Sequence, residues 1–185
     1  MPTAPSTVFT PGLQQVCGSN GDPMDVSGVQ IVTSASFTRP ADTVAYAALD
    51  VVSNSTTAAT VLTFANAGRT IGASGLILSA RHTKNNATIS GFRLFLWKAA
   101  PTAINDNLPF TLLYANRTNE VGFIDFNHVT GGTGSDASTA LTTFTGLPYV
   151  CAAGSSSLFG ILVATVGYTP ASAEQHLIEL TIAQN

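Results

Sequence analysis

Three histidines and ten acidic residues are the side chains from which this chain of 185 residues could build a catalytic or metal site. His82, His128 and His176 lie far apart in the sequence, and none belongs to an HxH or HExxH pattern, so we predict no metal site. We expect each histidine to lie at a strand end or on the surface. No serine occupies a GxSxG turn, so the sequence signature of a serine hydrolase is missing.

The carboxylates give no stronger indication of catalysis. A glycoside hydrolase needs two carboxyl groups that face each other across a cleft, and the candidates are Asp125 and Glu179. Ten acidic residues always allow some such pair. The segments NDN at 105–107 and GSD at 134–136 could offer oxygen atoms to calcium, but neither matches an EF-hand loop, and turn capping is the stronger interpretation. We therefore predict no catalytic residue, no cofactor and no enzymatic activity.

The composition favours a protein that packs against other proteins. Charged residues make up 9% of the chain, against roughly 25% in an average globular domain, and hydrophobic residues make up 45%. The two lysines, Lys84 and Lys98, lie far apart and the net charge is −3, so we expect no nucleic-acid binding. The apolar runs are too short to span a bilayer, and the N-terminal segment MPTAPSTVFT has no signal-peptide pattern, so we expect neither membrane insertion nor secretion.

The chain divides into an N-terminal arm at 1–28 and a β-sandwich domain at 29–185. The arm carries four of the nine prolines and shows no sustained periodicity, so we predict that it has no core of its own. Its apolar side chains are candidates for contact with a neighbouring subunit: Val8, Phe9, Leu13 and Val16. The alternative is a disordered leader. Cys151 follows an apolar stretch and is interpreted as a small buried side chain, while a bridge to Cys17 stays open.

Short alternating segments between turn residues predict eight or nine strands and no amphipathic helix. The expected strands are 29–38, 43–53, 60–67, 75–83, 92–99, 121–129, 158–168 and 176–185, and 130–139 is expected to be a flexible loop. In FRLFLWKA, at 92–99, both faces are largely apolar, which predicts a central strand covered on both sides, with Trp97 in the core. In the last strand, Ile178, Leu180 and Ile182 are expected to point inward. Eight strands with long connections fit a jelly roll or a related Greek-key sandwich.

Residues 36–52, SFTRPADTVAYAALDVV, gather several charged residues in a chain that has few. Pro40 fixes its φ angle and ends the preceding strand. Asp42 caps the turn with its side-chain oxygens, and Asp50 turns the chain again. Arg39 could pair with either aspartate. We interpret the segment as a structural turn motif, the alternative being that Arg39 and Asp42 project into a site.

The same stretch resembles a motif in a family of tailed-phage virion proteins. In that family a TRPA(D/N)T.AY..GD.V.NS segment opens the domain, and FRL.L(Y/W).A.PT…DN.PF and Y.PAS.E…I.L segments follow it. This chain has ASFTRPADTVAYAALDVVSNSTTAATVLTF at 35–64, FRLFLWKAAPTAINDNLPF at 92–110 and YTPASAEQHLIELTI at 168–182, in the same order. The resemblance covers about residues 35–183. Leu49 replaces the glycine that the family pattern has before the aspartate.

The resemblance implies a non-enzymatic virion structural protein. The role that fits best is a head decoration or cement protein, a β-sandwich that binds outside the capsid shell as a homotrimer at local three-fold positions. Its partners would be the major capsid protein and copies of itself, and it would pass from the cytoplasm of a bacterial host to the capsid surface. The alternatives are a tail or head-fibre protein that binds a host glycan, and a hydrolase on a jelly-roll scaffold.

Overall fold

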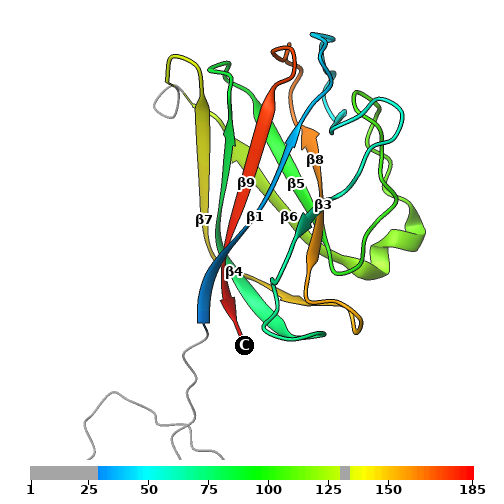
Figure 1. Ribbon diagram of the computed structural model, residues 1–185, viewed down its shortest axis with the longest axis vertical. Coiled ribbons are helices and arrows are strands. Elements are labelled where there is room, and N and C mark those ends of the chain that lie inside the picture. Colours follow the sequence, from blue (N-terminus) through cyan, green and yellow to red (C-terminus); the bar gives the residue numbers. More distant parts are fainter. Residues whose placement is uncertain (1–28, 130–133) are drawn as a thin grey trace, which may run out of the picture.

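Strand pairing divides the chain between two antiparallel sheets in the computed structural model, which describes residues 29–129 and 134–185 (Figure 1). The first sheet contains, in spatial order, β1 (Val29–Thr38), β9 (Gln175–Gln184), β4 (Ser74–Lys84) and β7 (Ser138–Val150). The second contains β2 (Val51–Val52), β8 (Leu158–Ala164), β5 (Gly91–Trp97) and β6 (Glu120–Asn127), and β3 (Leu62–Phe64) also pairs with β8. A short 3₁₀ helix, η1 (Tyr114–Asn119), lies between β5 and β6.

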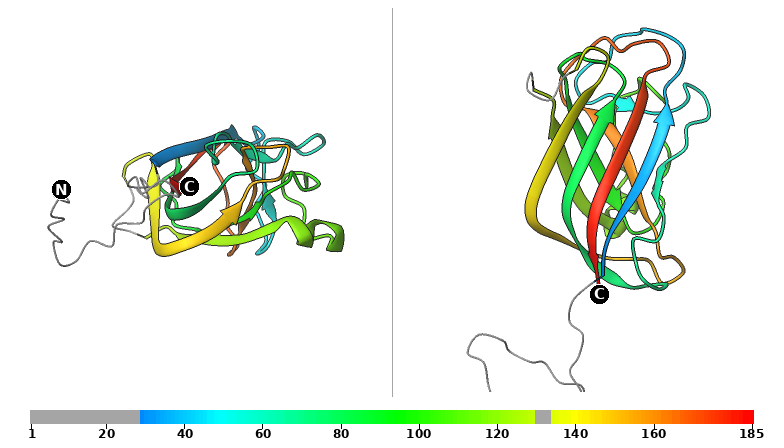
Figure 2. Two further views of the ribbon diagram at one scale, coloured as in Figure 1. Left: turned by 90° about the horizontal axis from the view of Figure 1, so that it is seen from below. Right: turned by 60° about the vertical axis from the view of Figure 1, so that its left-hand side comes forward.

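The strand order is that of a jelly roll. Because β2 and β3 both pair with β8, they take the place of one interrupted strand. Each strand in the first half of the chain then pairs with one in the second half: β1 with β9, β2 and β3 with β8, β4 with β7, and β5 with β6. A long hairpin of four such pairs, rolled so that the pairs alternate between sheets, gives this order. Figure 2 shows the first sheet as four neighbouring strands. The predicted all-β sandwich is confirmed.

Strand alternation places one apolar core between the sheets. Ile178, Leu180 and Ile182 of β9 are fully buried there, as predicted, opposite the inward side chains of β5. Trp97 is also fully buried, but on the other face of β5, under the connection that follows this strand. Phe110 of that connection stacks on Phe95 with ring centroids 4.4 Å apart. The prediction that this strand is covered on both sides is confirmed.

Several predicted elements differ from the structure. The strand β7 is not among the eight expected strand ranges, and the strands expected at 60–67 and 158–168 are shortened to β3 and β8. Only Val51–Val52 of the segment 43–53 forms a strand, because Leu49 has a positive φ of 72° and interrupts the extended backbone. Ser138 and Thr139, which we expected in a loop, begin β7. Their hydroxyls explain this, since Ser138 donates to the carbonyl oxygen of Asn86 and Thr139 shares a hydrogen bond with a threonine of β4.

The predicted N-terminal arm, 1–28, with its candidate contact residues Val8, Phe9, Leu13 and Val16, lies outside the described residues. Cys17 lies there too, so the structure does not test a bridge to Cys151, which is itself buried. No helix in the described ranges has the length and apolar character needed to cross a membrane.

Candidate functional site

The three motif segments of the sequence, 35–64, 92–110 and 168–182, meet at one end of the sandwich. Arg39 follows β1, and its main-chain N–H donates to the carbonyl oxygen of Glu174 at 3.0 Å. The ring of Tyr46 stacks on that of Tyr168 with centroids 5.1 Å apart. Asp50 forms an isolated bridge with Pro109 in the second segment. We call this meeting point the motif junction.

The side chain of Arg39 lies at the centre of the motif junction and is fully buried. Its Nη2 contacts Asp106 Oδ2 at 3.2 Å and Asp42 Oδ1 at 3.0 Å. Its Nε donates to the hydroxyl oxygen of Tyr46 at 2.8 Å, and that hydroxyl donates to Asp106 Oδ1 at 2.6 Å. The main-chain N–H of Ser53 adds a third hydrogen bond to Asp106, at 2.8 Å. The charged and polar groups therefore satisfy one another inside the protein.

The electrostatics of the motif junction keep its protonation fixed at physiological pH. Burial and the hydrogen bond to Asp106 raise the pKa of Tyr46 well above its usual value. Burial opposes the charge of Arg39, but its hydrogen bonds to Tyr46 and Asp42 outweigh this and raise the pKa of Arg39 further. Arg39 thus stays charged and Tyr46 stays neutral, which suits a structural ion pair better than a proton-transferring group.

The predicted turn residues lie in or beside this junction. Asp42 pairs with Arg39 and accepts the N–H of Val44 at 3.1 Å, whereas Asp50 accepts the N–H of Ala47 at 2.7 Å. The sequence reasoning missed Asp106, which it assigned to turn capping. The motif segment at 92–110 contained a signal for Asp106. This aspartate is the first residue of the DN pair in that motif, and it lies outside the expected strands and the expected core.

Beside the motif junction, the three histidines form a buried row. His128, which follows β6, places Nε2 2.9 Å from Nδ1 of His82 in β4. His82 in turn places Nε2 3.0 Å from Nδ1 of His176 in β9. Their exposed fractions are 3%, 0% and 1%, so none lies on the surface. The expected position at a strand end holds for His128, which follows β6, and for His176, the second residue of β9. The signal was the phase of β9, because His176 alternates in step with Ile178 and points inward with it.

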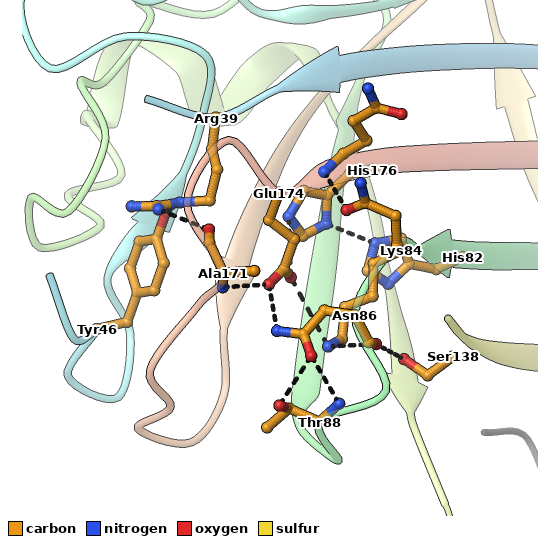
Figure 3. A network of polar contacts seen from close by, with 12 residues as sticks. Arg39, Tyr46, His82, Lys84, Asn86, Thr88, Ser138, Ala171, Glu174 and His176 are labelled. Atoms are coloured by element: carbon orange, nitrogen blue, oxygen red, sulfur yellow. Dashed lines mark hydrogen bonds and ion pairs between the residues drawn. The ribbon is translucent and has the colours of Figure 1, made fainter. Parts of the chain in front are cut away.

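A buried ion pair lies at one end of the histidine row (Figure 3). Oε1 of Glu174 lies 3.5 Å from Nε2 of His176 and 3.7 Å from Nζ of Lys84. Oε2 accepts hydrogen bonds from Asn86 Nδ2 at 2.7 Å and from the N–H of Ala171 at 2.9 Å. The carbonyl oxygen of Ala171 accepts from Arg39 at 3.3 Å and so connects the row to the motif junction. Burial lowers the pKa of Lys84, and Glu174 partly offsets that effect.

The histidines are neutral at physiological pH. Burial, together with the positive charge of Lys84, lowers the pKa of His128 to about 4 and that of His176 to about 3. Burial and the two neighbouring imidazoles hold the pKa of His82 well below its usual value. The ring nitrogens face one another in sequence rather than a common centre. Within the described part of the chain, no group of three or more His, Cys, Asp or Glu side chains is placed to hold a metal ion.

The other candidate residues for chemistry are separated or already engaged. Asp125 lies on the outer face of the second sheet and pairs with Arg93 at 2.6 Å, while Glu179 lies on the outer face of the first sheet and pairs with Arg81 at 2.7 Å. Outer faces of opposite sheets cannot meet across a cleft, so this pair does not form a hydrolase site. Of the calcium candidates, Asn105 accepts the N–H of Ala59 at 3.1 Å and Asp106 belongs to the motif junction.

The outer face of the first sheet carries little charge. Apart from the Arg81–Glu179 pair, its outward side chains are uncharged, and they include Val32, Ser34, Ser36, Thr83, Thr139, Leu141, Leu177 and Thr181. Its edge strand β1 pairs on one side only within the described residues, with β9. A groove of about 610 Å³ separates the other side of β1 from β2 and β3. An uncharged face beside a free strand edge is suited to contact with another protein.

Comparisons with known proteins add little to this description. No protein-family model matches the chain, and no curated protein matches it. One similar solved structure is that of deformed wing virus, a honeybee pathogen, with 7% sequence identity and a TM-score of 0.27. The alignment covers 100% of this chain and 54% of that chain. A similarity this low supports no argument about function, and the jelly-roll assignment depends on the strand order alone.

Proposed function

We propose that this protein is a non-enzymatic structural component of a tailed-phage virion, and that it decorates the outside of the capsid. The observation that carries the proposal is the motif junction. The residues that define the resemblance are buried and contact one another or neighbouring backbone at the end of the sandwich: Arg39, Tyr46, Asp50, Asp106 and Tyr168. They therefore have a structural role. A family defined by such residues shares a scaffold, and its function resides on the surface of that scaffold.

The surface supports contact with protein. The nearly uncharged outer face of the first sheet would pack against the shell without the cost of desolvating many charges. As a homotrimer at local three-fold positions, the protein would contact major capsid protein subunits across capsomer boundaries. Modest energy per contact, multiplied over linked copies, would then stabilise the shell against internal pressure. The arm, through Val8, Phe9, Leu13 and Val16, would contact a neighbouring subunit.

Co-sedimentation with matching capsids that lack the protein, followed by cryo-EM of the pellet, tests the decoration role. We expect saturable binding at repeated lattice positions. Leu141→Lys, at a side chain that is 65% exposed on the outer face of the first sheet, should reduce occupancy. Val166→Lys, at a loop side chain that is 50% exposed, is the matched control and should not. If the wild-type protein does not bind the shell, the decoration role is excluded.

The role of the arm has a separate test. Deleting residues 1–27 removes none of the described residues and should lower capsid occupancy or abolish trimer formation, which analytical ultracentrifugation measures. Unchanged occupancy together with an unchanged oligomeric state would remove the arm from the proposal and leave the decoration role standing.

Glycan binding by a tail or head fibre is the second candidate. Its supporting observation is the exposed aromatic ring of Phe123 on the outer face of the second sheet, 49% exposed. The guanidinium of Arg93 lies over this ring at 4.0 Å from the centroid and occupies one face that a sugar would stack on. Binding on a glycan array that Phe123→Ala abolishes would favour this role over decoration.

A further inference from the structure

The histidine row joins the two sheets. His82 and His176 belong to strands of the first sheet, and His128 directly follows β6 of the second. The hydrogen bond between His128 Nε2 and His82 Nδ1, 2.9 Å long, therefore crosses from one sheet to the other. The ring of Phe92 in β5 covers the row edge-on, with centroids 4.8 Å from His82 and 5.8 Å from His176. The chain has three histidines in all, so every one of them belongs to this row.

The charges at the end of the row fix the direction of its hydrogen bonds. Nε2 of His176 faces the carboxylate of Glu174 and carries a proton, because a lone pair there would repel the negative charge. Nδ1 of His176 must then accept a hydrogen bond from Nε2 of His82, and Nδ1 of His82 must accept one from Nε2 of His128. His128 and His82 thus each donate once from Nε2, and His82 and His176 each accept once at Nδ1. Nε2 of His176 lies 3.5 Å from the carboxylate of Glu174 and makes no hydrogen bond.

An added proton disrupts this arrangement. An imidazolium donates from both nitrogens and cannot accept. Protonated His82 would therefore point an N–H at the N–H of His128. The bond between the sheets would survive only if His128 moved its proton to Nδ1, which is buried without a hydrogen-bond partner. Protonated His176 would break the bond to His82 in the same way.

The surroundings of the row also oppose a positive charge. The charged and titratable groups packed around it from neighbouring elements are Lys84 on β4, Glu174 before β9, Arg39 after β1 and Tyr168 after β8. Glu174 is the negative group among them, and its carboxylate already pairs with Lys84. The ring of Phe37 in β1 stacks on His176 at 4.8 Å and adds apolar cover. A charge formed here would be buried without a counter-charge of its own.

We propose that the histidine row is an acid-sensitive latch, which fastens the two sheets together at neutral pH and gives the folded protein a stability that is lost progressively as the surroundings become mildly acidic.

The sign and size of the effect follow from linkage. A histidine whose pKa is lower in the folded than in the unfolded state does not lower the free energy of unfolding above about pH 6.5, its pKa in the unfolded chain. Below that pH the unfolded chain binds the proton and the folded protein does not, so the free energy of unfolding decreases as the pH falls. With pKa values of about 4 for His128 and about 3 for His176, each raises the unfolding equilibrium constant about thirtyfold between pH 8 and pH 5. Together they give about a thousandfold, or about 4 kcal/mol at 1.36 kcal/mol per tenfold change. His82 acts in the same direction.

Chemical denaturation of the full chain between pH 8 and pH 4, followed by the fluorescence of Trp97, tests the latch. The unfolding equilibrium constant should rise at least a thousandfold from pH 8 to pH 5, with a slope of two or more protons taken up on unfolding. Histidine is the side chain whose ordinary pKa lies in this range, so the change reports on the row. A rise of less than tenfold would overturn the proposal.

Two further measurements keep the test decisive. His128→Gln retains a donor and an acceptor but cannot titrate, so its pH dependence should be about thirtyfold smaller than that of the wild type. The control, Ile124→Val, lowers stability from the neighbouring core and should keep the wild-type slope. If His128→Gln does not fold, ¹⁵N NMR of the wild-type imidazoles replaces it. All three rings should remain neutral Nε2–H tautomers at pH 5.5, and ordinary titration near pH 6.5 would refute the latch.

Discussion

Replacing Asp106 with asparagine should distinguish the contribution to stability of the buried partner of Arg39, Asp106, from that of its partly exposed partner, Asp42. Asp106 is fully buried and accepts three hydrogen bonds, from the guanidinium, from the hydroxyl of Tyr46 and from the N–H of Ser53. An asparagine oxygen at the Oδ1 position keeps the last two. Its amide group then points N–H toward the guanidinium of Arg39, so the buried positive charge loses both an acceptor and its counter-charge.

The expected cost follows from the remaining partners of Arg39. Removing one member of a buried ion pair costs about 3–5 kcal/mol. Arg39 keeps Asp42 and carbonyl oxygens, including that of Ala171 at 3.3 Å, so we expect about 3 kcal/mol for Asp106→Asn. The matched control is Asp42→Asn. The side chain of Asp42 is 35% exposed, and an asparagine there can still accept from Val44, so we expect less than about 1 kcal/mol.

Urea denaturation at pH 7, followed by the fluorescence of Trp97, measures both variants. Asp106→Asn should lower the midpoint strongly with an unchanged slope m, while Asp42→Asn should stay close to the wild type. Equal effects of the two substitutions would show that burial does not set the strength of this ion pair, and the description of the motif junction as structural would then be wrong.

Three further predictions concern backbone strain, close packing and thiol burial. Leu49→Gly should raise the stability by about 0.5–1 kcal/mol in a thermal melt. A φ of 72° costs a leucine about 1–2 kcal/mol, and the greater entropy that glycine loses on folding cancels part of the gain from removing that strain. A lower Tm would contradict this. Gly75→Ala should cost about 1–3 kcal/mol in urea, since its new Cβ would meet Tyr149 and lie 2.7 Å from the carbonyl oxygen of Ala183. Gly154→Ala, with open space around it, should be neutral. In a Cys17→Ser background, Cys151 should react with a thiol reagent far more slowly when folded than in urea, because burial raises the pKa of its thiol; equal rates would refute its burial.

Strand periodicity carried most of the fold prediction. The segment 29–38 forms β1 with the predicted bounds, and the inward phase of Ile178, Leu180 and Ile182 is correct. Periodicity failed at 43–53, where a positive φ at a leucine interrupts the strand. Hydrophobic pattern reports which side chains point inward, and it carries no information about a backbone angle that leucine rarely adopts.

The polar clusters could not be predicted from spacing. Arg39 and Asp106 are 67 residues apart, and His82 and His176 are 94 residues apart. Their contacts depend on the pairing of strands from opposite halves of the chain. These contacts form only once the whole chain has folded into the two sheets. His82 and Lys84 alternate with Arg81 and Thr83, so from sequence either phase could have pointed inward.

These clusters also explain how strands rich in serine, threonine and alanine find a single register. A slip of two residues keeps the same side chains on the same face, so the hydrophobic pattern alone opposes it weakly. In the observed register Lys84 lies opposite His176, and Glu174 lies close enough to contact both. A two-residue slip that moves Ile178 of β9 opposite Lys84 would also move Glu174 away. The ammonium of Lys84 would then be buried without a carboxylate. The cost of that unpaired charge disfavours a slip in this direction, so the buried charges help to select the register in which the sheets close.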